Sequence, residues 1–435
     1  MRPSKPPSAL RVAPTSSAAL PNHPLPAGMR DILPPEAAGR RRLSRRLLDH
    51  FALHGYELVT PPAFELADVL ERGLGTLDPR DVLRFVEPES GEVAALRPDM
   101  TPQIARIAAT RLADRPLPMR LSYEGTVLRR RQERARKHRQ IPQAGVELLG
   151  VPGPEGDLEL LSLAVSTARA AGISDFVLDI GHADIARAMM NGVPASLASA
   201  LLDALAKKDA AVVGDLVTEA KLNAQLATAF RELPKLHGGA EVWKEAERVL
   251  APTPAGSSFR ALRDLWERAI AAGLEVVMRV DLGEVRGFAY YTGALFHLLA
   301  DGPGEPFGSG GRYDDLLSRF DAPMPAAGFG LDLDNLAWSL RVAGKEEGLD
   351  ARVLVSHAAT APALCSVLRG LGVGCVAAPP GEADAYARAW SFSHVFRQAS
   401  GGKFELLSLA TDRAVPLDAL RAPELAAQIA KVLLG

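Results

Sequence analysis

The stretch "GFGLDLDNLAWSLR", residues 328–341, joins a short Gly-Phe-Gly segment directly to an apolar helix pattern. Leucines recur at three- and four-residue spacing through the second half, which is the spacing of one buried helix face. Two polar residues, Asp332 and Asn335, stand where the segment passes into the helix. The junction raises two questions: which kind of sheet it belongs to, and whether a ligand binds there.

The composition of the chain is typical of a soluble globular protein. A chain of 435 residues is too long for one ordinary core, so two or three domains are expected. Apolar residues make up 47% and charged residues 23% of the chain, the balance of a soluble globular protein. The net charge of −2 argues against a broadly basic surface for nucleic acid.

Cysteine usage predicts a reducing compartment and no metal site. The only two cysteines are Cys365, on an expected helix, and Cys375, in a short apolar strand pattern. They form neither a Cys-x-x-Cys motif nor a Cys/His cluster, so we expect buried, inert thiols in the cytoplasm.

The N-terminal region predicts a tail and not a membrane anchor. Residues 1–26 are rich in Pro, Ser and Ala and lack the apolar core of a secretory signal. A disordered tail is expected there, with an organellar transit peptide as the open alternative. No run of about 18 apolar residues occurs, so no membrane span is predicted.

The order of elements predicts an α+β fold. Strand patterns such as "RLSYEGTVLRR" and "QAGVELLG" alternate with helical patterns, but not in strict βαβ order, which favours a largely antiparallel sheet. Residues 195–272 are Ala- and Leu-rich and predict a helical insertion. After a composition break near residues 342–351, residues 351–435 predict a small α/β domain that ends in a helix over 422–434.

Four segments carry polar residues that could face a ligand. "LRPDMTPQ" contains Asp99, Thr101 and Gln103 at a strand-to-helix junction. "VLRRRQERARKHRQIPQAGVE" carries a basic loop followed by Gln143 and Glu147. "VRGFAYYTG" contains an arginine and two tyrosines. "SGGRYDDL" places Arg312 in an expected Gly-rich turn, and "GPGEPFGSGG" is likewise interpreted as turns because it lacks a Walker ending.

An amino acid ligand would suit these side chains. Its ammonium group needs acceptors, which Asp99, Thr101 and Gln143 could supply. Its carboxylate suits an arginine fork from Arg129 or Arg286. An imidazole side chain has a donor and an acceptor, which Glu147 and Tyr291 could satisfy together.

Each of these residues also has a simpler interpretation. Glu147 could be half of a salt bridge, and the tyrosines could pack a strand with their hydroxyls at the surface. The basic loop from Arg129 to Arg139 could meet a phosphate-bearing ligand, an acidic partner surface or only solvent.

The segments together resemble the histidyl-tRNA synthetase family, which has a class II fold. "GMRDILP", "LRPDMT", "QAGVELLG", "RGFAYYTG", "GGRYDDL" and "AAGFGLDLDNL" occur in the order of that family. The similarity covers residues 27–341, and residues 351–435 resemble a shortened anticodon-binding domain. The resemblance implies an α+β class II aminoacyl-tRNA synthetase-like core with a mainly antiparallel sheet.

The resemblance also implies an L-histidine pocket, formed within a dimer. The positions that match the family's ligand-contacting residues are Asp99, Met100, Thr101, Arg129, Gln143, Glu147, Arg286, Tyr290 and Tyr291. The family usually has a glutamate where this chain has Asp99.

The nucleotide positions depart from the family. The glutamate of the second class II motif is replaced by Arg131, the arginine of the third motif by Asn335, and a strand glycine by Asp332. Ala289 stands where the synthetases usually have an acid. The resemblance therefore implies that activation of histidine by ATP is lost, because the charges that would stabilise its transition state are missing.

One branch of the family shares this pattern, the regulatory subunits of ATP phosphoribosyltransferase, the first enzyme of histidine biosynthesis. "LRPDMTPQIARI" and "LDLDNL" are similar to that branch. This implies a non-catalytic chain without cofactor, which acts in a hetero-oligomer with a short catalytic subunit and makes that subunit sensitive to histidine. A divergent histidyl-tRNA synthetase and an amino-acid-sensing paralogue acting on another enzyme remain alternatives.

Overall fold

The computed structural model describes residues 25–74, 82–129, 138–285, 290–345, 351–379, 382–399, 402–418 and 421–434. The chain forms two compact units. The larger contains Leu25–Ile32 and Arg40–Glu346, and the smaller contains Glu347–Gly435. Among the described residues, no helix is both long enough and apolar enough to cross a membrane.

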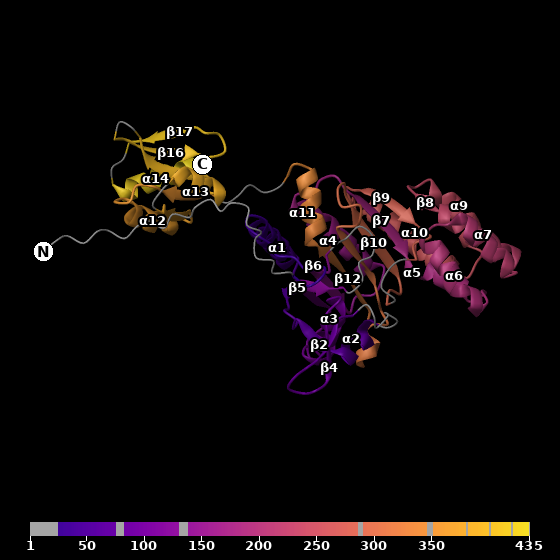
Figure 1. The fold of residues 1–435 in the computed structure, drawn as a ribbon. Coiled ribbons are helices and arrows are strands. Elements are labelled where there is room, and N and C mark those ends of the chain that lie inside the picture. The colour runs from indigo at the N-terminus through magenta and orange to yellow at the C-terminus, as the bar shows by residue number, and fades with distance from the viewer. Residues whose placement is uncertain are drawn as a thin grey trace. The chain divides into compact units, whose positions relative to one another are not determined.

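A nine-stranded sheet forms the centre of the larger unit (Figure 1). In spatial order its strands are β1 (Glu57–Leu58), β5 (Met119–Leu128), β6 (Gln140–Leu149), β12 (Ala326–Asp332), β11 (Gly308–Arg312), β10 (Ala294–Leu299), β7 (Val177–His182), β9 (Val277–Asp281) and β8 (His237–Gly238). Only the β1–β5 and β7–β9 pairs are parallel. The predicted α+β fold with a mainly antiparallel sheet is confirmed.

One face of this sheet is covered by long helices. They are α1 (Glu36–Leu53), α4 (Glu155–Ala171) and α11 (Leu333–Val342). Residues at alternate positions of β6, such as Val146, join Leu47 and Phe51 of α1 in the main hydrophobic core. Phe51 packs edge-on against Phe329 of β12, with ring centroids 6.0 Å apart. Because strand side chains alternate between faces, the intervening residues of β6 point to the opposite side.

That opposite face carries α3 (Thr101–Thr110), the 3₁₀ turn Leu317–Phe320 and a second, smaller core. Next to α3 lies a three-stranded sheet of β2 (Phe64–Leu66), β4 (Val93–Leu96) and β3 (Arg84–Val86), which packs on α2 (Ala67–Leu74). This face therefore holds both apolar packing and the polar residues described below.

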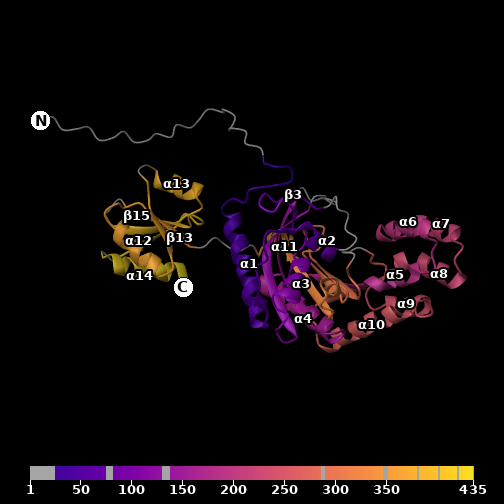
Figure 2. The same cartoon turned by 90° about the horizontal axis from the view of Figure 1, so that it is seen from below.

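A set of helices extends from the β7 and β9 side of the sheet, at the end opposite α1 in both views (Figures 1 and 2). They are α5 (Ala183–Met190), α6 (Ala195–Ala206), α7 (Ala210–Glu219), α8 (Ala224–Glu232), α9 (Val242–Leu250) and α10 (Gly256–Ala271). The Asp209 side chain caps α7 by accepting a hydrogen bond from the Val212 backbone N–H, and the Asn223 side chain caps α8 by accepting one from the Leu226 backbone N–H. Lys208 Nζ binds both carboxylate oxygens of Asp281, at 2.7 and 2.5 Å, and ties these helices to β9.

The smaller unit is a five-stranded sheet with three helices. Its strands, in spatial order, are β14 (Gly374–Ala377), β13 (Arg352–Val355), β15 (His394–Gln398), β16 (Phe404–Ser408) and β17 (Ala414–Leu417). Its helices are α12 (Ala361–Gly370), α13 (Ala383–Ala389) and α14 (Ala422–Leu434). The predicted terminal helix over 422–434 is confirmed, as are the helix around Cys365 and the strand around Cys375.

The Gly-rich segment before Arg312 was predicted as turns, and this is wrong for Gly308–Arg312, which form strand β11. The glycines are needed for close packing inside the sheet. A Cβ on Gly310 would collide with Phe329 and lie 2.5 Å from the Gly328 carbonyl oxygen. Glycine here signals a crowded strand and not a chain reversal.

Arg312 itself points at α4. Its Nε donates to Asp157 Oδ1 at 2.7 Å, and its Nη1 donates to Asp314 Oδ1 and to the Val151 carbonyl oxygen. Both Arg312 and Asp157 are largely buried. Burial raises the pKa of the Asp157 carboxyl, and the adjacent guanidinium opposes that rise. Arg312 is therefore a structural residue of the helix-covered face.

We expect Arg312→Met to lower the free energy of unfolding by about 3 kcal/mol, because it leaves Asp157 buried without its cation. Arg263 of α10 is the matched control, since it pairs with Glu247 and Glu267 at the surface. Arg263→Met should change the stability by roughly 0.5 kcal/mol or less. Urea unfolding measures both variants, and equal losses would contradict a structural role specific to Arg312.

Candidate functional site

Glu147 is the centre of a cluster of buried polar side chains, a candidate ligand pocket, on the sheet face that carries α3. It lies on β6, and its side chain is only 1% exposed. Its register partner on β12 is Gly328. A Cβ on Gly328 would fall on Glu147 Oε2 and lie 2.5 Å from Tyr313 Oη. A glycine is therefore required opposite Glu147 to leave room for the carboxylate.

Among the described residues, only one of the two Glu147 carboxylate oxygens has a hydrogen-bond partner. Thr101 Oγ1 donates to Oε1 at 2.6 Å. Oε2 is buried and has no hydrogen-bond partner in the described part of the chain. Burial raises the pKa of Glu147 well above its ordinary value, while the Thr101 hydrogen bond lowers it and the nearby Asp99 charge raises it further. An incoming N–H donor would satisfy Oε2 and offset the cost of burying it.

Asp99 forms the adjoining wall. Its Oδ2 accepts a hydrogen bond from Tyr290 Oη at 2.6 Å, and its Oδ1 accepts from the Met100 backbone N–H at 2.7 Å. Asp99 is buried, and so is Tyr290. The carboxylate is thus fixed in orientation at the start of α3, although each oxygen can still accept a further bond.

Four tyrosines enclose the pocket. Tyr290 and Tyr291 lie with ring centroids 5.1 Å apart, and Tyr290 and Tyr313 are 5.5 Å apart, edge to face. Tyr123 of β5 completes the set, and its hydroxyl would lie 2.5 Å from a Cβ on Gly145. Burial raises the pKa of Tyr290 and of Tyr291 above the ordinary tyrosine value, so both hydroxyls stay protonated and can donate.

Tyr313 and Tyr123 were not among the predicted site residues. Tyr313 Oη is buried and has no hydrogen-bond partner in the described residues, like Glu147 Oε2. The tyrosine follows Arg312 directly in "GGRYDDL", but its role becomes visible only when β12 brings Gly328 beneath it. Tyr123 follows the period-two pattern of β5, which predicts burial but not a ligand.

The other predicted residues are placed as follows. Arg129 follows the end of β5 and is half-buried, with its Nε 3.3 Å from the Pro98 carbonyl oxygen. Burial raises the pKa of Tyr291, and the charge of Arg129 opposes that rise. Gln143 lies on β6 on the Glu147 face, with its Oε1 buried and unpartnered in the described residues. The Met100 side chain belongs to the small core beside α3. Arg286 lies outside the described residues, as do Ala289 and Arg131.

At the start of α11, the position that the family resemblance gives to an ATP-binding arginine is Asn335. Its Nδ2 donates to the Pro306 carbonyl oxygen at 2.8 Å, and its backbone N–H donates to Asp332 Oδ1 at 3.1 Å. Asp332 caps the helix. Asp334 forms ion pairs with Arg30, at 3.0 Å, and with Arg40. The first turn of α11 is thus bound to its own chain.

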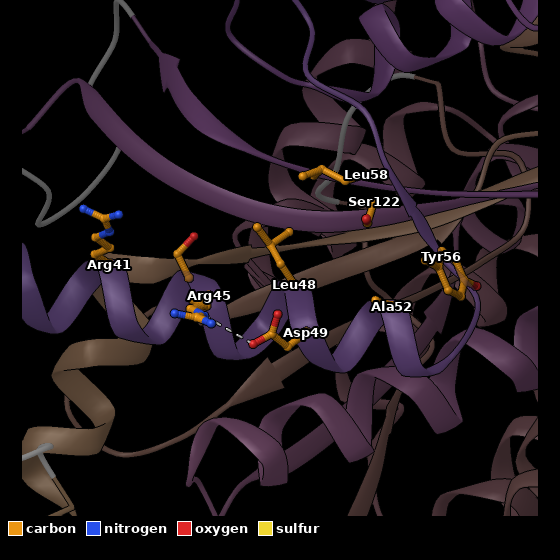
Figure 3. Close-up of a pocket in the computed structure, with 9 residues that line it drawn as sticks. Arg41, Arg45, Leu48, Asp49, Ala52, Tyr56, Leu58 and Ser122 are labelled. Carbon is orange, nitrogen blue, oxygen red and sulfur yellow. Dashed lines mark ion pairs between the residues drawn. The ribbon is translucent and has the colours of Figure 1, made fainter. Parts of the chain in front are cut away.

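A groove of about 550 Å³ lies along α1 and the outer edge of the sheet (Figure 3). It is lined by Arg41, Ser44, Arg45, Leu48, Asp49, Ala52, Tyr56, Leu58 and Ser122. Arg45 and Asp49 form an ion pair along the helix. Within the described ranges, strand β1 pairs with β5 alone and is the terminal strand of the sheet on this side. The groove is separate from the Glu147 pocket, because Ser122 alternates with Tyr123 and points to the opposite face.

In the described part of the chain, no group of three His, Cys, Asp or Glu side chains is arranged to hold a metal ion. The buried polar atoms of the pocket are acceptors and hydroxyls from Glu147, Gln143 and Tyr313. They suit a small polar ligand with N–H groups.

Comparison with known proteins supports the same fold. The histidyl-tRNA synthetase family profile matches residues 28–336. A protein of Syntrophotalea carbinolica named ATP phosphoribosyltransferase regulatory subunit is 35% identical over 419 residues, which are 93% of this chain and 98% of that protein. A Moorella thermoacetica protein of the same name is 40% identical over 314 residues, 72% of this chain and 80% of that one.

Solved structures agree with this assignment. An ATP phosphoribosyltransferase regulatory subunit/histidyl-tRNA synthetase from Bacillus halodurans C superposes with a TM-score of 0.74 at 27% identity, covering 86% of this chain and 97% of that one. The histidyl-tRNA synthetase of Nostoc sp. PCC 7120, at 21% identity, shares the fold with a TM-score of 0.75 over 95% of this chain and all of that one. The chain belongs to the family of ATP phosphoribosyltransferase regulatory subunits, which is built on the class II fold of histidyl-tRNA synthetases.

Proposed function

We propose that this chain is a non-catalytic, histidine-sensing subunit of ATP phosphoribosyltransferase. It would support the activity of a short catalytic subunit in the first step of histidine biosynthesis and confer feedback control by histidine. The observation that carries the proposal is the buried Glu147 carboxylate, which has one unpartnered oxygen above a glycine floor. A retained amino acid pocket explains this arrangement, since an unsatisfied buried oxygen is otherwise a cost to the fold.

In this proposal, each polar group of histidine has a hydrogen-bond or ionic partner among the pocket residues. The imidazole N–H would donate to Glu147 Oε2, with a tyrosine hydroxyl completing the ring's second hydrogen bond. The ammonium group would lie against Asp99, Thr101 and Gln143. The carboxylate would pair with Arg129, with Arg286 as a second cation, because a guanidinium fork fixes carboxylate orientation.

The same site lacks support for ATP chemistry. Asn335 uses its amide on the Pro306 carbonyl oxygen, so it supplies no positive charge at the start of α11. Aminoacyl adenylate formation requires such charge at the phosphates. We therefore infer that synthetase activity is lost and that the ligand pocket serves regulation alone.

The same proposal also specifies how the chain assembles with itself and with the catalytic subunit. The chain would form a dimer within a hetero-oligomer with the catalytic subunit, in the cytoplasm. The candidate surface for self-association is the β1 edge with the groove beside α1, where edge strand β1, exposed Leu58 and the Arg45–Asp49 ion pair occur together.

RNA binding by the smaller unit does not fit its charges. Three of its arginines are engaged in ion pairs within the unit, Arg388 with Asp412, Arg397 with Asp384 and Glu405, and Arg421 with Glu424. A phosphate-binding surface needs cations that are not already neutralised. The ion pairs of these three arginines therefore disfavour nucleic acid as a partner of this unit.

We expect Glu147→Gln to weaken L-histidine binding about 10- to 100-fold, because it removes a charge-assisted hydrogen bond of about 1.5–3 kcal/mol. Calorimetric titration of the purified chain measures this. Glu159→Gln is the matched control, since Glu159 lies on α4 and pairs with Arg120. Unchanged affinity in Glu147→Gln with an intact fold would show that the pocket is misassigned.

ATP should neither bind to the free chain nor exchange pyrophosphate in the presence of histidine. The physical reason is the missing cation at Asn335. A pyrophosphate-exchange assay with a true histidyl-tRNA synthetase as positive control tests this. Histidine-dependent exchange would establish the alternative, a divergent synthetase.

Feedback should pass through this pocket. In the complex with the catalytic subunit, Glu147→Gln should raise the histidine concentration for half-inhibition by the same factor as it weakens binding, because coupling between sites is reciprocal. The Glu159→Gln complex should match the unaltered complex. If inhibition stayed unchanged while binding to this chain weakened, histidine would act on the catalytic subunit instead.

A further inference from the structure

The smaller unit brings the only two cysteines of the chain into contact. Cys365 lies on α12 and Cys375 on β14, and their Sγ atoms are 2.7 Å apart. Both residues are buried, at 4% and 9% exposure, and both are free thiols. Ten positions separate them in the sequence, so their contact is a product of the helix–strand packing.

The backbone around the pair is held in register by Arg369. This residue lies one helical turn after Cys365, and its Nε and Nη2 donate to the Cys375 carbonyl oxygen at 3.0 and 2.8 Å. The two hydrogen bonds fix the start of β14 against α12. Leu364 and Leu368 pack in the same hydrophobic cluster. The packing of α12 against β14 therefore brings the two thiols together.

The pair lies at the edge of the five-stranded sheet. β14 is the outermost strand and pairs only with β13. An edge strand opens more readily than a central one, because fewer backbone hydrogen bonds must break. Opening of β14 would expose both thiols at once to a small molecule such as hydrogen peroxide.

We propose that Cys365 and Cys375 form a reversible intramolecular disulfide under peroxide stress, which fastens β14 to α12. One thiol loses its proton, and the thiolate attacks a peroxide oxygen; the O–O bond breaks, the leaving hydroxide takes up a proton to become water, and a sulfenic acid results. The second thiol then attacks the sulfenic sulfur, and a second water leaves as the S–S bond forms. In total, two thiols and one hydrogen peroxide give one disulfide and two water molecules.

The reaction should be slow. Burial, more than the hydrogen bond to Cys365, raises the pKa of the Cys375 thiol, so little thiolate is present at neutral pH. Thiolate is the reacting form. The pair would thus remain reduced under ordinary conditions and respond to sustained oxidant, and the disulfide would then hold the unit's edge closed until a reducing thiol opens it.

The test treats the full-length chain with excess hydrogen peroxide, removes the peroxide with catalase, and alkylates under denaturing conditions. We expect a mass loss of two hydrogen atoms, no alkylated cysteine and a cross-linked peptide pair containing Cys365 and Cys375. Dithiothreitol should restore two alkylatable thiols. Amide hydrogen exchange in β14 should be slower in the oxidised chain and recover on reduction.

Cys375→Ser serves as the matched control and should keep one alkylatable thiol without any cross-link. Oxidation of the eight methionines reports that peroxide has acted. The proposal is overturned if the methionines are oxidised while both thiols stay alkylatable. It is also overturned if the cysteines pass to sulfinic acid, or if the disulfide joins two chains.

Discussion

The close pairing of β6 with β12 at Glu147 and Gly328 is the constraint on which the pocket depends. A carboxylate can be buried on a sheet face only where the neighbouring strand leaves space, and only a glycine does so here. The same register places Gly145 and Gly330 against the Tyr123 hydroxyl. The glycines thereby leave space on the sheet beside Glu147, and the polar groups of α3 and the tyrosines lie around that space.

This arrangement is costly without a ligand. Glu147 Oε2, Gln143 Oε1 and Tyr313 Oη are buried without hydrogen-bond partners in the described residues. Each such atom destabilises the fold by roughly 1–3 kcal/mol. A folded chain tolerates that loss because the helix-covered face, from α1 through β6 to α4, supplies a large continuous core. The unpartnered buried atoms of the pocket lower the stability of the fold, and the core of the helix-covered face compensates for that loss.

Periodicity and order were sufficient to predict the antiparallel sheet, the helices over residues 195–272 and the terminal helix, because each rests on local patterns. The roles of residues whose partners are far away in the sequence were harder to predict. Arg312 was expected in a turn, yet the glycines before it are packed in a strand and its partner Asp157 is 155 positions away in sequence. Tyr313 and the contact between Cys365 and Cys375 likewise become visible only in three dimensions.

Loss of a catalytic role and gain of a regulatory one are compatible within this fold. Catalysis requires groups that bind the transition state more tightly than the substrate. A sensor requires only that its ligand bind two states of an assembly unequally. At the start of α11, Asn335 donates to the Pro306 carbonyl oxygen, and Asp334 forms ion pairs with Arg30 and Arg40. In the proposed function, a ligand that donates to the unpartnered atoms around Glu147 would supply ligand-dependent free energy, which is the quantity that a regulatory subunit can transmit.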